Sequence, residues 1–500
     1  MPSVWSQLPF EVIVKIAFSI EDAKDLLTFL KTIQDDIDFG PLEHLFELGK
    51  VKSKWDFWPW LHLVPPILQA LPSTSLGATA NYYPKVVVED NFDVDWVKEN
   101  LDPMTKIQWN IEKSSITMDD RSDIRITRLD VRSSDFTRIS WKDLLSRLPH
   151  LTYLDVDDGY KTFSDVFEFV AMSNQITEFL AYTMWYKMTT TDVIHLTKWF
   201  RSQPVRRLQL ALVDMGDVDI DVKKAFYEVM LKCHTLETLV LSNKGFTDLR
   251  FSKLPLSLKT LVLNFEDITS DVLKSLACGL EGSCVKRVRI VNYEDENTEG
   301  LEYLLRVLPR TSIQHLELRY FRIDDTTWCK FAPLFECCPV RKLILHSEKI
   351  PAGFAHAFAT AVQKNQFICE LDLDHSDVGL SDLQQLIRSF SISSQPVKTR
   401  QFKWKGPYDQ SILDSEKESL KKLAAECGVE FMNRYSNWSF WYVVPIMTIF
   451  NVKYLDCNKN FVYIHKCLLH DFSVSFDEAR DPNSKLSHWC TESWIDSAIN

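Results

Sequence analysis

The 500-residue chain contains little glycine and proline, 13 and 20 residues respectively. Together with 45% hydrophobic and 25% charged residues, this scarcity excludes a collagen-like, low-complexity or disordered chain. A basic excess is missing as well, because 57 Lys and Arg stand against 69 Asp and Glu, a net charge of −12. Wide nucleic-acid binding needs a basic surface, so we expect neither nucleic acid nor an anionic membrane as a partner.

Export signals and membrane-spanning segments are also missing from the sequence. Residues 1–15, MPSVWSQLPFEVIVK, do not pair a basic start with an apolar stretch, so we expect no secretory signal. The longest apolar run, 440–450, is interrupted by Pro445 and Thr448 and is shorter than the ~20 residues that span a bilayer. Eleven cysteines, an odd number, do not suggest a disulfide framework. We therefore expect a protein of the cytoplasm, the nucleus or both.

A hexamer of the form apolar-x-x-apolar-x-apolar recurs through most of the chain. Its eleven copies start 22 to 31 residues apart, with a mean near 27. They are ITRLDV (126–131), LTYLDV (151–156), ITEFLA (176–181), VRRLQL (205–210), LETLVL (236–241), LKTLVL (258–263), VKRVRI (285–290), IQHLEL (313–318), VRKLIL (340–345), ICELDL (368–373) and VKTRQF (397–402). Repetition at this period indicates a stack of similar structural units.

Each unit combines a strand pattern with a helix pattern. The hexamer alternates as a short strand does, and helical spacing follows it in segments such as 300–308, 353–362 and 380–390. The unit from Leu236 to Leu258 is too short for a full helix, so we expect an extended or one-turn crossing there. Such units bury their apolar faces only by stacking on their neighbours. The pattern thus predicts an α/β solenoid with a parallel β-sheet inside and helices outside.

The repeats resemble leucine-rich repeats of the ribonuclease-inhibitor-like class over residues 105–435. The segments beside them lack the period. Residues 51–104 are rich in tryptophan and punctuated by proline, which predicts an irregular junction. Residues 436–500 form an aromatic-rich tail whose role the sequence does not indicate.

Residues 1–50 lack the repeat and instead show the pattern of two short amphipathic helices joined by an acidic linker. A Leu-Pro pair before the first helix and the apolar face of both helices resemble the amino-terminal half of an F-box. In that family the module docks onto the Skp-type adaptor of a cullin-RING ubiquitin ligase. The resemblance assigns the adaptor contact to Leu8, Pro9, Val12, Ile16, Leu26 and Leu30. The alternative is a helical cap that covers the first repeat.

An F-box followed by leucine-rich repeats is typical of substrate receptors. The resemblance therefore implies a non-catalytic substrate-recognition subunit of a Skp–cullin–F-box ubiquitin ligase, which binds a target protein through the solenoid. The alternative is a leucine-rich-repeat interaction scaffold without a ligase role, whose amino-terminal helices only form a cap.

The inner face of the solenoid can be deduced from the strand alternation, which turns the third, fifth and seventh positions of each repeat inward. The first repeats place acidic side chains there, among them Asp155, Asp157 and Glu178. The last full repeat places Glu370, Asp372 and Asp374. The central repeats place Arg287, Arg289, His315, Glu317, Arg319, Lys342 and His346. This basic centre predicts an acidic or phosphorylated target segment, unless the side chains are merely solvated strand residues.

Signatures of catalysis and of ligand binding are missing. The chain contains no G-x-x-x-x-G-K-[ST], G-x-G-x-x-G, H-E-x-x-H or C-x-x-C motif. The segment 217–228 matches the acidic positions of an EF-hand, but Val222 stands where that loop needs glycine, so we expect an acidic helix start instead. The cysteines and histidines of the tail fit no zinc spacing. We predict no enzyme activity, cofactor or metal.

Overall fold

The computed structural model describes residues 5–432, except 38, 52–56, 65–72, 90–91, 112–123, 133–146, 159–162, 244, 266–267, 293–297, 322–324, 347–349, 374–375, 377, 392–399 and 405–413. The tail predicted from residue 436 lies outside the described residues. Within the described part, no helix has the length and apolarity needed to cross a membrane.

Fifteen strands of the described residues form a single sheet. They follow one another across the sheet in chain order, and every neighbouring pair is parallel. The strands are β1 (Leu61–Leu63), β2 (Lys85–Glu89), β3 (Lys106–Ile111), β4 (Ile126–Arg132), β5 (Tyr153–Asp158), β6 (Glu178–Lys187), β7 (Arg207–Asp214), β8 (Thr238–Asn243), β9 (Thr260–Phe265), β10 (Arg287–Asn292), β11 (His315–Arg319), β12 (Lys342–His346), β13 (Glu370–Asp372), β14 (Arg400–Lys403) and β15 (Val429–Met432).

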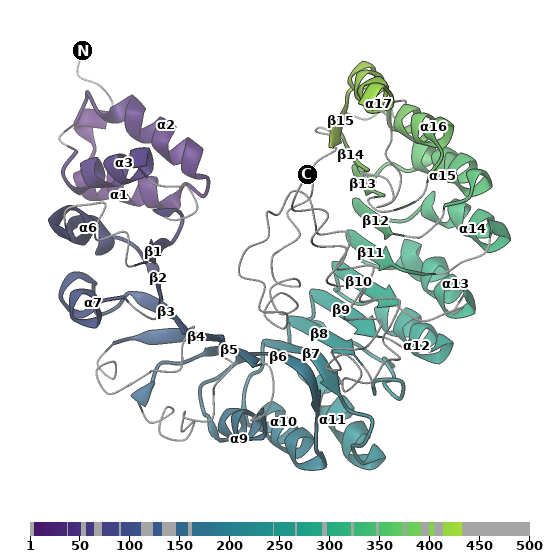
Figure 1. The fold of residues 1–500 in the computed structure, drawn as a ribbon, viewed down its shortest axis with the longest axis horizontal. Helices are drawn as coiled ribbons and strands as arrows, with labels where there is room; N and C mark the ends of the chain where they lie inside the picture. The colour runs from purple at the N-terminus through teal and green to yellow at the C-terminus, as the bar shows by residue number, and fades with distance from the viewer. Residues whose placement is uncertain are drawn as a thin grey trace, which may run out of the picture. The chain divides into compact units, whose positions relative to one another are not determined.

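Helices connect most of these strands and lie along one face of the sheet (Figure 1). Three helices precede the sheet: α1 (Phe10–Ser19), α2 (Ala23–Ile33) and α3 (Pro41–Val51). The helices between strands are α6 (Ser73–Ala80), α7 (Val94–Asn100), α9 (Phe163–Met172), α10 (Thr190–Ser202), α11 (Ile220–Lys232), α12 (Ser270–Leu280), α13 (Thr298–Val307), α14 (Asp325–Phe331), α15 (Ala352–Lys364), α16 (Leu380–Ser391) and α17 (Asp414–Glu426), with short 3₁₀ turns at Trp5–Gln7, Leu308–Arg310 and Ala332–Phe335.

The predicted α/β architecture with a parallel sheet and a helical layer is confirmed. Every one of the eleven hexamers contributes a strand, from β4 to β14. From β4 to β13, equivalent positions of neighbouring hexamers align across the sheet, as Arg287 aligns with Thr260 on one side and His315 on the other. The last hexamer is shifted by two residues, because Glu370 at a third position aligns with Gln401 at the fifth position of 397–402. The buried apolar residues form one continuous core from Ile13 to Val429. Stacking of repeats is therefore what buries the apolar face of each one.

The prediction of an irregular junction over residues 51–104 is wrong. Two strand–helix units occupy this segment, because β1 and β2 are the first strands of the sheet and α6 and α7 follow them. In β2 the successive residues Val86, Val87 and Val88 are all buried, so the alternation of a half-exposed strand is missing from its sequence. The sheet also extends beyond the last hexamer by one strand, β15.

The short unit between β8 and β9 crosses without a helix in its described residues, as predicted. Its chain lies directly against α12. The backbone amide of Phe251 donates a hydrogen bond to the Ser275 hydroxyl at 3.2 Å, and a Cβ atom at Gly279 would overlap the Phe251 carbonyl oxygen. Glycine at 279 thus lets the non-helical crossing approach the helix.

Replacing Gly279 with alanine is expected to lower the free energy of unfolding by about 1–3 kcal/mol, because the new methyl group displaces packed backbone. This loss opposes the gain of up to ~1 kcal/mol that alanine gives a helix interior. Urea denaturation followed by circular dichroism measures the difference. The matched control is Cys278→Ala at an exposed position of the same helix, which should change stability by less than about 0.5 kcal/mol. Equal stability of Gly279→Ala and wild type would contradict the close approach.

The predicted helix start within residues 217–228 is also confirmed. Asp219 precedes α11, and its carboxylate accepts hydrogen bonds from the backbone amides of Asp221 at 2.9 Å and Val222 at 3.1 Å. This is an N-cap, in which the side chain satisfies amides that have no partner inside the helix.

Candidate functional site

The face of the sheet turned away from the helices, which we call the open face, carries the predicted target-binding side chains. In β10, Val288 and Ile290 are fully buried on the side of the helices, whereas Arg287 is exposed on the open face. Across β10, β11 and β12 the third position holds Arg287, His315 and Lys342 in register. The structure therefore brings the residues of the predicted basic centre together on adjacent strands.

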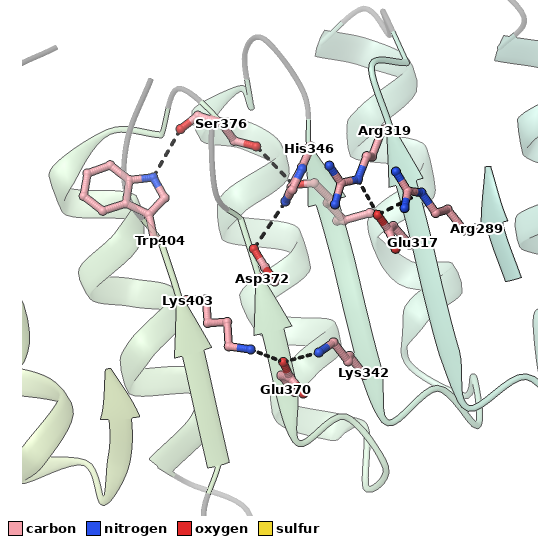
Figure 2. A network of polar contacts seen from close by, with 11 residues as sticks. Arg289, Glu317, Arg319, Lys342, His346, Glu370, Asp372, Ser376, Lys403 and Trp404 are labelled. Atoms are coloured by element: carbon pink, nitrogen blue, oxygen red, sulfur yellow. Dashed lines mark hydrogen bonds and ion pairs between the residues drawn. The ribbon is translucent and has the colours of Figure 1, made fainter. Parts of the chain in front are cut away.

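A buried carboxylate links two arginines of this centre. Glu317 on β11 is 2% exposed and forms ion pairs with Arg289 on β10, at 3.3 Å, and with Arg319 on its own strand (Figure 2). Burial alone would raise the pKa of Glu317, but Arg319 and Arg289 outweigh it and lower the pKa below its usual value. Glu317 therefore stays ionised and neutralises part of the positive charge beside it.

A second carboxylate links two lysines in the same way. The Glu370 carboxylate on β13 lies 2.6 Å from the Lys342 ammonium on β12 and 2.6 Å from the Lys403 ammonium on β14 (Figure 2). Burial opposes the ionisation of Glu370, yet its hydrogen bonds to the two lysines lower its pKa. One carboxylate thus connects three neighbouring strands.

His346 on β12 and Asp372 on β13 form a third polar contact, with 3.3 Å between Nε2 and Oδ1. Burial lowers the pKa of His346, although Asp372 favours its charged form. Close by, the Ser376 hydroxyl donates to the carbonyl of Leu345 at 3.0 Å, and the Trp404 indole donates to the carbonyl of Ser376 at 3.2 Å (Figure 2). These contacts tie the end of β12 to the loop after β13 and to the residue after β14.

His315 on β11 is the other histidine of the predicted centre. Burial, followed by the charges of Arg287 and Lys342 on the strands beside it, lowers the pKa of His315 to about 4. Both histidines are therefore uncharged at pH 7. At pH 7 the positive charge of the predicted basic centre therefore comes from its arginines and Lys342, because the surroundings of His315 and His346 disfavour protonation.

The acidic side chains expected from the first repeats also lie on the open face. Asp130 on β4 and Asp155 on β5 are in register and both buried. The Arg132 guanidinium donates two hydrogen bonds to Asp130, at 3.1 and 2.9 Å, and the Tyr153 hydroxyl donates to Asp155 at 3.0 Å. Burial, and then the neighbouring charge of Asp130, raise the pKa of Asp155 to about 7. This end of the open face carries less negative charge than its sequence indicates.

The amino-terminal residues predicted to contact an adaptor separate into two groups. Leu26 and Leu30 of α2 are fully buried and belong to the continuous core, so they do not form an accessible surface, and their assignment to it is corrected. In contrast, Val12 of α1 is 39% exposed. Pro9 is exposed, and Leu8 and Ile16 are half-buried. The accessible part of the predicted contact is thus confined to α1 and the residues just before it.

The described part of the chain brings together no group of three or more His, Cys, Asp or Glu side chains that could hold a metal ion. The cysteines and histidines of the predicted tail lie outside the described residues; they are Cys457, His465, Cys467, His470, His488 and Cys490. Comparison with protein-family models and with curated proteins finds no match for the chain.

Proposed function

We propose that the chain is a non-catalytic substrate-recognition subunit of a Skp–cullin–F-box type ubiquitin ligase. The helices α1 to α3 bind the Skp-type adaptor, and the open face of the leucine-rich-repeat sheet binds the target protein. The observation that carries the proposal is the open face itself. Among the described residues, fifteen parallel strands carry their helices along one face of the sheet (Figure 1). On the other face, polar and charged side chains of neighbouring strands are in register. Repeat proteins use such extended faces for binding.

The geometry of the open face supports binding of a partner more than catalysis. Most charged groups at its centre form ion pairs with one another, since Glu317 and Glu370 each pair with two basic side chains. Such groups fix the shape and the charge pattern of a surface. In the proposed complex the ubiquitin transfer is carried out by the associated subunits.

The proposed adaptor contact predicts that charged substitutions in α1 greatly weaken binding of the Skp-type adaptor. Changing Val12 and Ile16 together to aspartate should abolish capture of the Skp-type adaptor, because interface energy concentrates in a few apolar anchors. Co-precipitation with purified adaptor measures this, with circular dichroism as the check on folding. The matched control is Thr28→Asp on the exposed side of α2, which should leave capture intact.

The second candidate function is an interaction scaffold without a ligase role, in which α1 to α3 are a cap. Two observations favour it. The core of α2 continues into the core of the sheet, and the Trp58 indole donates to the carbonyl of Ile20 at 2.8 Å, which ties the end of α1 to the start of the repeats. If wild-type protein fails to capture the adaptor, the substrate-receptor function is contradicted and the scaffold function takes its place. Affinity capture and mass spectrometry with and without residues 1–50 would then identify the partners of the open face.

A further inference from the structure

We propose that Thr260, Arg287 and His315, which are neighbours across β9, β10 and β11, form a subsite that binds one oxyanion of an acidic target segment. The oxyanion is either a carboxylate or a phosphate ester, and the experiment below distinguishes the two. The inference rests on the proposed binding role of the open face and gives that role a definite chemistry.

Arg287 differs from the other cations at the centre of the open face. Arg289, Arg319 and Lys342 each have a carboxylate partner, either Glu317 or Glu370. Arg287 is exposed, and no carboxylate of the described residues forms an ion pair with it. An exposed guanidinium without an ion-pair partner presents its planar N–H donors to solvent. This planar arrangement can donate two parallel hydrogen bonds to a carboxylate or a phosphate.

The neighbours of Arg287 extend the subsite on both sides. Thr260 on β9 and His315 on β11 are its register partners, one strand spacing of ~4.8 Å away in each direction. Thr260 is half-buried and adds a hydroxyl donor. His315 Nε2 is buried, and none of the described residues offers it a hydrogen-bond partner. A donor and an imidazole therefore flank the free guanidinium.

The charges around His315 explain how the subsite would respond to a ligand. Arg287 on β10 and Lys342 on β12 disfavour its protonation, whereas Glu317 on its own strand and Glu370 on β13 favour it, and the balance leaves a low pKa. An oxyanion bound at Arg287 adds a negative charge on the same side. Binding must therefore raise the pKa of His315, and by reciprocity protonation of His315 must tighten binding.

The test is NMR titration of the full chain with ¹³C-labelled histidine rings, His315 being assigned by the signal lost in His315→Gln. The titration is run at equal ionic strength in inorganic phosphate, in malonate, which keeps an ionised carboxylate at the pH where His315 titrates, and in chloride. We expect the oxyanion to raise the pKa of His315 from about 4 by about one unit, equivalent to about tenfold tighter binding to the protonated form. In Arg287→Gln, the oxyanion should no longer change this pKa. Lys198→Gln, at an exposed position of α10, should behave as wild type.

The outcomes separate the alternatives. A response to phosphate alone assigns a phosphorylated segment, and an equal response to malonate assigns a carboxylate segment. No response to either anion, or a response that persists in Arg287→Gln, overturns the subsite. Loss of the subsite is distinguishable from failure of the proposed function, because adaptor capture through α1 is measured separately and does not depend on Arg287.

Discussion

Replacing Glu317 with alanine is expected to lower the free energy of unfolding by about 3–5 kcal/mol. The carboxylate is 2% exposed and lies between Arg289 and Arg319, whose side chains are themselves only 20% and 14% exposed. Its removal leaves two guanidinium groups side by side without the charge that compensates them. Leaving such buried charges uncompensated costs far more than losing a solvated pair.

Urea denaturation at pH 7 measures this loss, and two further variants test its origin. Glu317→Gln keeps hydrogen-bond acceptance and volume but removes the charge, so it should lose less than alanine. Glu299→Ala removes the 65%-exposed partner of Lys274, at 2.8 Å, and should cost less than about 1 kcal/mol. Similar losses for Glu317→Ala and Glu299→Ala would show that burial does not strengthen the contact.

The stabilisation by Glu317 also has a defined pH dependence. Because Arg319 and Arg289 lower its pKa against the opposing effect of burial, the folded state favours the ionised form. This contribution is fully present above the usual pKa of 4.5 and is lost as the pH falls through the lowered value.

The strands could be predicted from sequence because their signal is local. The hexamer alternates with the period of a half-exposed strand, and its recurrence identifies β4 to β14. β1 and β2 lack this signal, since β1 has three residues and β2 is apolar at three successive positions. β1 and β2 join the sheet because they pair with the strands that follow them. Residue patterns within 51–104 do not reveal this pairing.

The position of the site residues was predictable, but their ionisation and pairing were not. Strand alternation alone places Arg289, Glu317 and Lys342 on the open face. The ion pairs join residues of different repeats, and not always residues in register. Glu370, for example, contacts Lys403, whose register partner is Asp372. The charge state of His315 depends on burial and on cations from two other strands, which only the assembled sheet specifies.

Replacing Asp155 with asparagine is expected to stabilise the protein at pH 8 and to leave it unchanged at pH 4. In the folded state, burial and Asp130 raise the pKa of Asp155 to about 7 from its usual 3.8, against the opposing effects of Tyr153, Arg132 and Arg207. A raised carboxyl pKa means that folding favours the protonated form. Its stabilisation is present below pH 3.8 and is lost as the pH rises through 7.

Asparagine resembles the protonated carboxyl, and its amide oxygen can still accept the hydrogen bond of Tyr153. The pKa difference corresponds to a gain of at most about 4 kcal/mol at pH 8. Urea denaturation of wild type and Asp155→Asn between pH 4 and 8 should give stability curves that nearly meet at pH 4, separate steadily as the pH rises toward 7, and keep a constant difference above that. Glu168→Gln, at an exposed position of α9, should follow wild type throughout. If Asp155→Asn instead lowers stability at pH 8, the prediction is contradicted. The arginine neighbours of Asp155 would then stabilise its ionised carboxylate more than burial and repulsion from Asp130 destabilise it.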